Sequence, residues 1–542
     1  MSGHIQIPPP QNEPVLSYAP GTPERAELKA TLQRMAEEVV EIPLIIGGEE
    51  VRTGRVHDFV CPHDHQKVLA TWHGAGPEEL EQALESGREA WKTWSRMPWE
   101  ERAAVFLKAA DLLAGPWRAI VNASTMLGQS KTAHQAEIDA ACELADFYRF
   151  NAYFAEEIYA QQPISDPGIW NRLEYRPLEG FVYAVSPFNF SSIGGNLCGA
   201  PVLMGNVALW KPSHTALLNN YYIMKVLMEA GLPAGVINFI AGDSSEITDY
   251  LLRQRDFAGL HFTGSTGVFH MFWKRIGANI ANYASYPRIV GETGGKDFIL
   301  AHPTADPEAL VTAMIRGAFE YQGQKCSAAS RAYVPESLWA EIEGPLVEQT
   351  DAITMGDPTD FTNFMGAVID DRAFRKLSRY IDDARQSEEA DIIAGGEYDD
   401  SKGYFIRPTL ILARNPRYVT MCEELFGPIL TIHVYPDDAW EETLELVDTT
   451  SPYALTGAVF ARDRAVLQQA TEALRHAAGN FYLNDKPTGA VVGQQPFGGS
   501  RASGTNDKAG SAFNLLRWIT PRTLKENFDP PRDYRYPFMD EA

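Results

Sequence analysis

The chain has 542 residues, which is too long for one ordinary hydrophobic core, so we expect at least two large domains. Hydrophobic residues make up 45% of it and charged residues 22%, proportions near globular averages that argue against a disordered or fibrous chain. The formal net charge of −24, with no stripe of Lys or Arg to override it, excludes nucleic acid and anionic lipid as expected partners. No apolar run reaches the length of about 18 residues that a membrane span needs, so no membrane span is predicted.

The five cysteines are widely spaced and include no CxxC pair, a pattern that favours a reducing compartment over a disulfide framework or a zinc site. The first residues contain neither an apolar signal core nor an Arg-rich amphipathic stretch. We therefore expect a cytoplasmic location, or the mitochondrial matrix if a presequence has been removed.

Much of the first 165 residues carries apolar side chains at three- and four-residue spacing, which is typical of amphipathic helices. This spacing predicts helices at residues 23–40, 79–94, 99–113 and 135–159, with a short strand at 42–46. Residues 170–185 instead alternate polar and apolar side chains, which indicates extended strands.

From residue 181 onward, short apolar runs alternate with helical segments. We predict strands at residues 181–185, 207–211, 236–241, 260–263 and 288–290, and helices at 193–204, 217–230, 246–253 and 268–276. This alternation indicates an α/β protein with a parallel sheet, where ligands bind beyond the carboxyl ends of the strands. A second alternating series covers residues 296–473, and a glycine-rich segment follows at 489–504. The dinucleotide fingerprint GxGxxG is absent, and its nearest feature, GSTG at 264–267, is short.

Six short motifs follow one another in a fixed order along the chain. They are SPFNF at 186–190, KPS at 211–213, GETGGK at 291–296, GQKCSA at 323–328, EELFGP at 423–428 and PFGG at 496–499. Together with the interval between Glu292 and Cys326, these motifs resemble the aldehyde dehydrogenase superfamily over nearly the whole chain.

Longer stretches narrow this resemblance. NEPVLSYAPGTPER, AEIDAACELADFYRFNA, FEYQGQKCSAASRAYVP and VVGQQPFGGSRASGTNDKAG look like the delta-1-pyrroline-5-carboxylate dehydrogenase branch. The resemblance implies NAD-dependent oxidation of glutamate gamma-semialdehyde to glutamate, the second step of proline breakdown. A related dehydrogenase for another omega-semialdehyde is the alternative. A scaffold without catalysis is disfavoured, because a nucleophile, a base and an oxyanion donor are all present.

The resemblance also implies the fold, which is a Rossmann-like NAD-binding domain, an α/β catalytic domain and a small β-strand flap that pairs subunits. We assign the N-terminal helical part of the NAD-binding domain to residues 1–165, the flap to 166–180 with a C-terminal arm at 516–542, the Rossmann-like core to 181–293, the catalytic domain to 294–480, and a return segment with the substrate-anchor loop to 481–515. A homodimer or a multiple of dimers is expected, and a proline-oxidising enzyme is considered as a transient partner.

Oxidation of an aldehyde by hydride transfer first needs a nucleophile that attacks the carbonyl, and the resemblance gives this role to Cys326. A free cysteine has a pKa of about 8.5, so its surroundings or a base have to raise the thiolate fraction. The resemblance makes the Asn189 side chain and the Cys326 backbone N–H the oxyanion donors, and Glu292 the base that activates water. Without the family, Asn189 reads as a turn former after Pro187 and Glu292 as a solvated loop charge.

The cofactor NAD is expected beyond the carboxyl ends of the first sheet. The resemblance places Lys211 on the adenosine ribose hydroxyls and the start of the helix at 264–268 on the pyrophosphate, since backbone N–H groups and the helix dipole favour anions. The expected NAD-binding residues are Ser186, Pro187, Phe188, Lys211, Gly264, Ser265, Thr266, Gly267, Val268, Glu424 and Phe426. Ser213 stands where many family members carry a Glu that repels a 2′-phosphate, so NADP stays open.

The expected substrate carries a carboxylate that has to be held inside an acidic protein. The branch uses the backbone N–H groups of a loop, here Gly489 and Ala490, and some relatives have Ser at the second position. Ser327 is expected as a further donor, Phe497 as a wall against the aliphatic chain, and Glu143 as the partner of the substrate ammonium. The alternatives are a solvated surface carboxylate for Glu143 and a core position for Phe497. No metal is expected.

Overall fold

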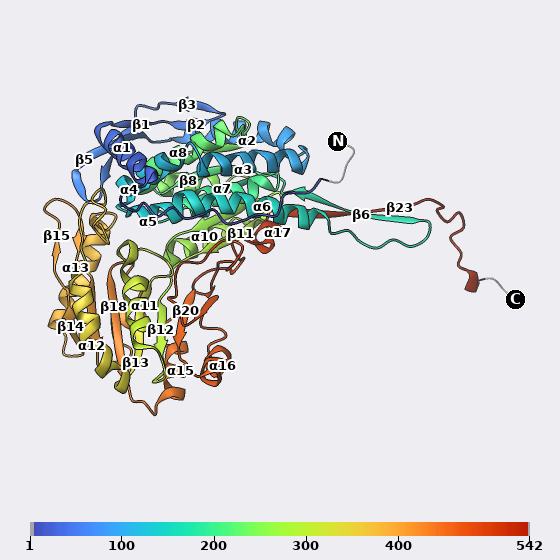
Figure 1. Cartoon of the computed structure of the whole chain (residues 1–542). Helices are drawn as coiled ribbons and strands as arrows, with labels where there is room; N and C mark the ends of the chain where they lie inside the picture. Colours follow the sequence, from blue (N-terminus) through green and yellow to red (C-terminus); the bar gives the residue numbers. More distant parts are fainter. Residues whose placement is uncertain (1–4, 540–542) are drawn as a thin grey trace.

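The computed structural model describes residues 5–539 and shows two α/β lobes with a long arm that projects away from them (Figure 1). The ends of the predicted first segment and of the predicted C-terminal arm, residues 1–4 and 540–542, lie outside the described residues. No helix in the described part is long and apolar enough to cross a membrane.

The first lobe is built on a seven-stranded sheet. Its strands, in spatial order, are β11 (Arg288–Glu292), β10 (Phe257–Thr263), β7 (Phe181–Ser186), β8 (Val207–Pro212), β9 (Ile237–Phe239), β2 (Leu44–Ile46) and β3 (Glu49–Val51). The first five strands pair in parallel, and β2 and β3 add an antiparallel edge. Every residue of β8 and β10 is buried, which is what a parallel sheet covered by helices on both faces requires.

Helices cover both faces of this sheet. They are α1 (Pro23–Glu37), α2 (Pro77–Trp94), α3 (Trp99–Ala114), α4 (Arg118–Gln129), α5 (Ala133–Ala136), α6 (Leu144–Tyr159), α7 (Ser191–Leu203), α8 (Leu217–Glu229), α9 (Ser244–Leu251) and α10 (Thr266–Ala278). Between α5 and α6 the chain forms a π-helical segment, η1 (Glu137–Glu143), inside the single helix that the spacing predicts at 135–159. A π-helical turn inserts one extra residue per turn and is frequent at functional sites.

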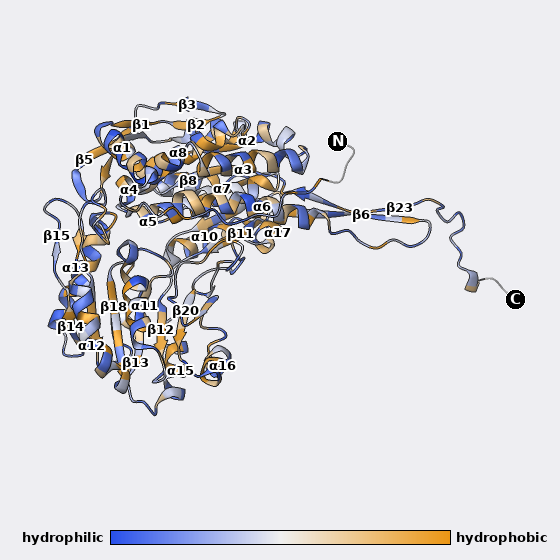
Figure 2. Cartoon of the chain, in the orientation of Figure 1, coloured by the Kyte–Doolittle hydropathy of each residue, from blue (hydrophilic) through white to orange (hydrophobic). Residues whose placement is uncertain are grey.

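The second lobe contains the other large sheet. Its strands, in order, are β14 (Ala390–Ala394), β17 (Thr409–Ala413), β18 (Ile429–Tyr435), β13 (Ala329–Pro335), β12 (Asp297–Ala301), β20 (Thr456–Phe460) and β21 (Asn480–Leu483). Its main helices are α11 (Pro307–Phe319), α12 (Glu336–Asp351), α13 (Asp371–Gln386), α15 (Trp440–Thr449) and α16 (Arg464–Ala473). The central strands β12 and β20 are strongly hydrophobic (Figure 2), as expected of strands buried between helices.

Shorter elements complete the described chain. They are β1 (Val40–Ile42), β4 (Val56–Cys61) and β5 (Asp64–His73), the pair β15 (Tyr398–Asp399) and β16 (Phe405–Ile406), the pair β19 (Tyr453–Ala454) and β22 (Ser500–Arg501), and the helices α14 (Val419–Cys422) and α17 (Ala512–Leu516). The hairpin of β4 and β5 was not predicted. The predicted helix at 23–40 is too long, because the chain leaves it after Glu37 to form β1 beside β5.

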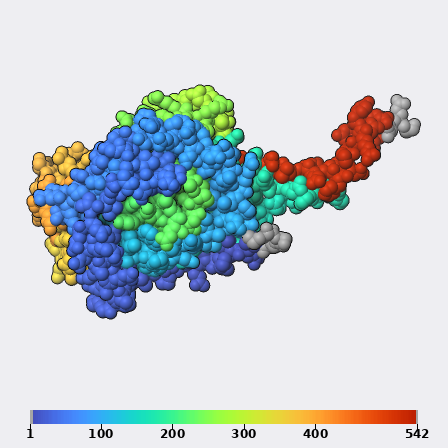
Figure 3. All heavy atoms as spheres, turned by 90° about the horizontal axis from the view of Figure 1, so that it is seen from above, coloured from blue at the N-terminus to red at the C-terminus, as the bar shows by residue number. Residues whose placement is uncertain are grey.

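The projecting arm is a two-stranded antiparallel ribbon of β6 (Ile169–Pro177) and β23 (Ile519–Asn527), followed by the chain's tail (Figures 1 and 3). It joins the segments predicted as the flap and the C-terminal arm, which are more than 340 residues apart in the sequence. Aromatic side chains along the arm stay exposed, including Trp170, Phe528 and Tyr534. A two-stranded ribbon is only marginally stable in water by itself, so an exposed ribbon with apolar side chains is expected to pack against another protein surface.

Candidate active site

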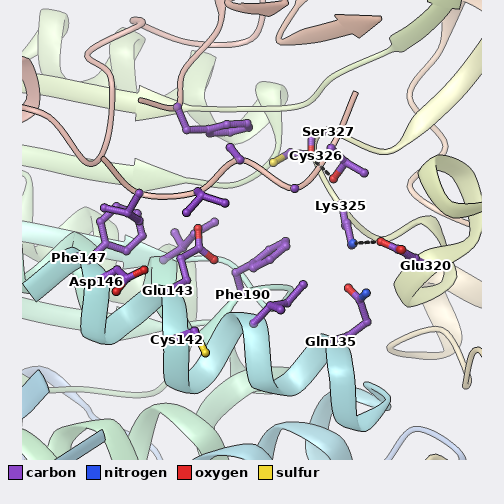
Figure 4. A pocket seen from close by; sticks show the side chains of 18 of the residues that line it. Gln135, Cys142, Glu143, Asp146, Phe147, Phe190, Glu320, Lys325, Cys326 and Ser327 are labelled. Carbon is purple, nitrogen blue, oxygen red and sulfur yellow. Dashed lines mark hydrogen bonds and ion pairs between the residues drawn. The ribbon is translucent and has the colours of Figure 1, made fainter. Parts of the chain in front are cut away.

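A cavity of about 1020 Å³ contains side chains from both lobes. It brings together seven of the residues singled out in the sequence, namely Cys326, Glu292, Ser327, Glu143, Gly489, Ala490 and Phe497. Glu143 points from its helix into the cavity, and Cys326 with Ser327 lies across from it (Figure 4). The cavity therefore places a thiol, two carboxylates and a glycine-containing loop around one space.

The loop that carries Cys326 has an unusual backbone. Tyr321, Gln322 and Gly323 have φ values of 52°, 56° and 65°, three successive residues in the left-handed region. For a non-glycine residue that conformation costs about 1–3 kcal/mol and persists only where the surroundings enforce it. The Gln322 amide does so, because it donates to the carbonyls of Ser130 at 3.0 Å and Ala367 at 2.7 Å.

The Cys326 thiol is half-buried, and burial raises its pKa well above the ordinary value. The negative charge of Glu292 raises this pKa further, and so do the more distant carboxylates of Asp297 and Glu424. The thiol is therefore protonated at neutral pH. A reaction at Cys326 requires a proton acceptor or a ligand that changes this field.

Glu292 is the last residue of β11 and is bridged to Gly504. It is half-buried on the cavity wall and is not a solvated loop charge. Burial raises the pKa of its carboxyl to about 8, with Lys508 acting to lower it and Asp507 to raise it. A carboxyl with a pKa near the working pH is suited to accept and return a proton.

Asn189 lies in the loop between β7 and α7 and is buried. Its side-chain N–H donates to the carbonyl oxygen of Gln324 at 3.1 Å, two residues before Cys326. The Asn189 side chain does not line the cavity surface itself. The structure thus places the predicted oxyanion donor against the nucleophile loop, with its amide engaged by that loop.

The loop predicted to anchor the substrate carboxylate contains backbone N–H groups that have no hydrogen-bond acceptor among the described residues. In the described chain, neither the Gly489 nor the Ala490 backbone N–H donates to a protein group. Gly489 has a φ of +95°, and a Cβ at this position would lie 3.1 Å from the Lys486 ammonium. Lys486 also lines the cavity and was not identified from the sequence, although it stands in the same KPTGA stretch. The Ser327 hydroxyl is 2.8 Å from that of Thr488, so the two hydroxyls share a hydrogen bond.

Glu143 is the last residue of the π-helical segment and is half-buried, so a solvated surface position is wrong for it. Its carboxyl accepts a hydrogen bond from the Ser192 hydroxyl at 2.9 Å. Burial raises its pKa to about 8, and the charge of Asp139 acts in the same direction. Phe497 lines the cavity and does not belong to any core cluster.

The residues expected to bind the cofactor lie outside this cavity, at the carboxyl edge of the first sheet and near it. Ser186, Lys211 and Gly264 are at or just after the ends of β7, β8 and β10, and Ser265 to Val268 begin α10. The Ser186 hydroxyl accepts a hydrogen bond from Trp210 at 3.1 Å and is committed to the core. Phe188 and Phe426 pack edge to face with ring centroids 5.7 Å apart.

Several of these residues fit a dinucleotide. Lys211 is buried, yet its ammonium makes only a long bond of 3.4 Å, to the Pro212 carbonyl, and burial lowers its pKa to about 8. It therefore keeps donors for ribose hydroxyls. At the start of α10 no atom lies within 4 Å of a Cβ built on Gly267, so a phosphate has room beside the helix N-terminus. Glu424 accepts from the Gly295 backbone N–H at 3.0 Å.

Comparisons with known proteins agree with this arrangement. The aldehyde dehydrogenase family model matches residues 50–523, so the chain belongs to the aldehyde dehydrogenase family. Within that family it is 55% identical to the mitochondrial delta-1-pyrroline-5-carboxylate dehydrogenase of Dictyostelium discoideum, covering 98% of this chain and 96% of that one. It is 50% identical to the mitochondrial enzyme of Homo sapiens, covering 97% and 94%. A crystal structure of the Mycobacterium tuberculosis delta-pyrroline-5-carboxylate dehydrogenase bound with NAD matches it with a TM-score of 0.97 and 53% identity, covering all of both chains.

Proposed function

We propose that this chain oxidises glutamate gamma-semialdehyde, the open form of delta-1-pyrroline-5-carboxylate, to glutamate with NAD as the oxidant. The observation that carries this proposal is the cavity that places Cys326 and Glu292 beside the unpaired N–H groups of Gly489 and Ala490. The relatives named for delta-1-pyrroline-5-carboxylate dehydrogenase support it.

The chemistry follows from the side chains. The Cys326 thiol loses its proton to solvent water, and the resulting thiolate attacks the aldehyde carbon, so that a C–S bond forms as the C=O π bond breaks and its electrons go to the former carbonyl oxygen as a negative charge. The Asn189 amide and the Cys326 backbone N–H are the proposed donors to that oxygen. NAD, when bound, accepts the hydride, and Cys326 is left as a thioester. Glu292 then takes a proton from water, which attacks the thioester carbon and releases the carboxylic acid and the thiolate.

Both ends of the substrate have matching groups in the cavity. The amino-acid carboxylate fits the N–H groups of Gly489 and Ala490 with the Lys486 ammonium beside them. The substrate ammonium fits Glu143, whose raised pKa means that without a neighbouring cation its carboxyl is largely protonated at neutral pH. A bound cation lowers the pKa of a neighbouring carboxyl, so binding at neutral pH releases a proton from Glu143.

The test is NADH formation, followed by absorbance, with delta-1-pyrroline-5-carboxylate, succinate semialdehyde and propionaldehyde. We expect kcat/KM to be at least about a hundred-fold higher for the first substrate, which corresponds to about 2.7 kcal/mol of differential transition-state binding. If succinate semialdehyde is preferred, the chemistry at Cys326 stands but the substrate assignment is wrong, and the alternative omega-semialdehyde takes its place. The same assay with NADP measures the cofactor preference that Ser213 leaves open.

We further propose that the β6–β23 arm pairs this chain with a second copy, as the exposed aromatic residues along it indicate. Removal of residues 519 onward should reduce the number of subunits in the oligomer, measured as its molar mass in light scattering. If the number of subunits is unchanged, the contact between subunits lies elsewhere.

The cytoplasm or the mitochondrial matrix is the expected location, and a proline-oxidising enzyme is the expected supplier of the substrate.

A further inference from the structure

Lys131 is a buried cation that the proposed reaction does not use. It is 1% exposed and follows α4 directly after Ser130. Its ammonium donates to the Asp139 carboxylate at 2.6 Å. Burial of a cation is unfavourable unless the cation is paired, and even a buried ion pair adds little to stability. The position of this pair therefore calls for a reason other than stability.

The partner of Lys131 caps the helix that follows the Asn189 loop. Asp139 accepts hydrogen bonds from the backbone N–H groups of Ser191 and Ser192, each at 2.9 Å. These are the first two residues of α7, whose own N-cap position, Phe190, provides no side-chain acceptor. A carboxylate at a helix N-terminus satisfies orphan donors and complements the helix dipole. The Lys131–Asp139 pair therefore fixes where α7 begins, two residues after Asn189.

Lys131 also contacts the loop of Cys326. Its ammonium lies 4.2 Å from the centroid of the Phe190 ring and 4.5 Å from that of the Tyr321 ring. Phe190 is the neighbour of Asn189, and Tyr321 is the first of the three left-handed residues before Cys326. A cation between two aromatic faces attracts both, and desolvation strengthens the attraction.

The residue before Lys131 supports the same loop. The Ser130 carbonyl accepts from the Gln322 amide at 3.0 Å, and its hydroxyl accepts from the Ala367 backbone N–H at 2.9 Å. Ser130 and Lys131 thus contact Gln322 and Tyr321, two successive strained residues, from one side.

We propose that Lys131 is a positioning residue that fixes the Asn189 loop against the Cys326 loop, so that the oxyanion donor meets the substrate oxygen on Cys326. Lys131 itself does not line the cavity and acts through its neighbours. The inference rests on the proposed function in one respect, the role of Asn189 as an oxyanion donor.

A double-mutant cycle tests this inference. Lys131→Met keeps an unbranched side chain that is one atom shorter and removes the charge. We expect it to lower kcat for delta-1-pyrroline-5-carboxylate by about ten- to a hundred-fold with little change in KM. This is less than the loss of about a hundred- to a thousand-fold expected when an oxyanion donor is removed outright. In an Asn189→Ala background the same substitution should change kcat by less than about three-fold, because the group that it positions is already absent.

A matched control is Arg102→Met. Arg102 is another buried cation that contacts α7, but at its far end, where it donates to the Leu203 carbonyl at 2.9 Å. We expect this variant to lose thermal stability and to keep kcat within about two-fold. If Lys131→Met does not fold, Asp139→Asn breaks the same ion pair and enters the same cycle.

A second readout avoids the cofactor. Hydrolysis of p-nitrophenyl acetate requires attack by Cys326 and an oxyanion donor, but no hydride transfer, and should fall in parallel in Lys131→Met and Asn189→Ala. If the two effects on kcat multiply in the double variant, Lys131 acts independently of Asn189 and the inference is overturned. If Asn189→Ala alone retains full activity in both assays, the oxyanion assignment fails and this inference with it. Neither result depends on which aldehyde is preferred.

Discussion

The raised pKa of Glu292 predicts where the pH dependence of turnover lies. Burial raises this pKa to about 8 from an ordinary value of 4.5. About a tenth of the carboxyls are then ionised at pH 7 and about nine tenths at pH 9. If the carboxylate is the base that activates water, hydrolysis of the thioester should increase about ten-fold over that interval. A solvated glutamate would complete its titration far below pH 7 and give no such rise.

The assay is kcat for NADH formation with delta-1-pyrroline-5-carboxylate between pH 6.5 and 9.5, in the wild type and in Glu292→Gln. The variant should lose the rising limb and about a hundred- to ten-thousand-fold in kcat, the usual contribution of a general base. It should also retain a burst of about one NADH per active site, since the negative charge of Glu292 raises the thiol pKa of Cys326 and its removal leaves that thiol easier to ionise.

A second variant tests the direction in which a neighbouring charge shifts the pKa of Glu292. Asp507 contributes to the raised pKa of Glu292, so Asp507→Asn should move the rising limb to lower pH without abolishing it. A wild-type profile that stays flat between pH 6.5 and 9.5 would refute the role of burial, because a carboxyl with a pKa near 4.5 is fully ionised over that whole range. A lost burst in Glu292→Gln would refute the division of labour, because Glu292 would then be needed for the attack by Cys326 as well.

Three further outcomes follow from the cavity. Lys486→Met should raise KM for delta-1-pyrroline-5-carboxylate about ten-fold, which corresponds to about 1.4 kcal/mol of binding free energy, and should leave KM for propionaldehyde unchanged. Equal increases in KM for the two substrates would show that Lys486 does not bind the substrate carboxylate. Glu143 has a folded pKa raised to about 8, so its contribution to stability is lost as pH rises from about 4.5 to 8. Glu143→Gln should therefore gain melting temperature relative to the wild type at pH 9 but not at pH 4.5, and an equal shift at both would contradict the burial effect. Cys326→Ser should abolish NAD reduction, and full activity would disprove the nucleophile.

The alternation of apolar runs and helical segments predicted most strands of the first sheet, because a strand buried on both faces appears in the sequence as an unbroken apolar run. The predicted strands at 181–185 and 207–211 correspond to β7 and β8, with small differences at their ends. The β4–β5 hairpin was missed for the opposite reason. It carries His, Asp and Lys on an exposed face, and its pairing depends on contacts that the local sequence does not contain.

The single helix predicted at 135–159 shows that the spacing of apolar residues does not reveal a π-helical segment. Helical periodicity ran across the π-helical segment, since one extra residue shifts the apolar pattern only slightly. That shift decides the direction of Glu143, which the sequence left open between cavity and solvent. Gly489→Pro would not be a clean test of the anchor loop, because the φ of +95° at Gly489 is incompatible with proline and the substitution would distort the whole loop.

The positioning role proposed for Lys131 could not be predicted from the sequence, because it depends on contacts between distant segments. Lys131 meets Phe190 and Tyr321, which are separated from it by about 60 and 190 positions. No periodicity or motif encodes such a meeting. The motif around Cys326 predicts the reacting residue, whereas the residues that contact its loop are scattered along the chain.

The electrostatics of the cavity resolve the conflict between an acidic chain and an anionic substrate. The chain carries a net charge of −24, and several carboxylates, including Glu143 and Glu292, face the cavity. Burial raises the pKa of both to about 8, so near neutral pH both are mostly uncharged. The Lys486 side chain lies beside the anchor loop and lines the cavity. The local field near the anchor is therefore less negative than the residue count implies, and Glu292 becomes a proton acceptor as its carboxyl ionises near its raised pKa of about 8.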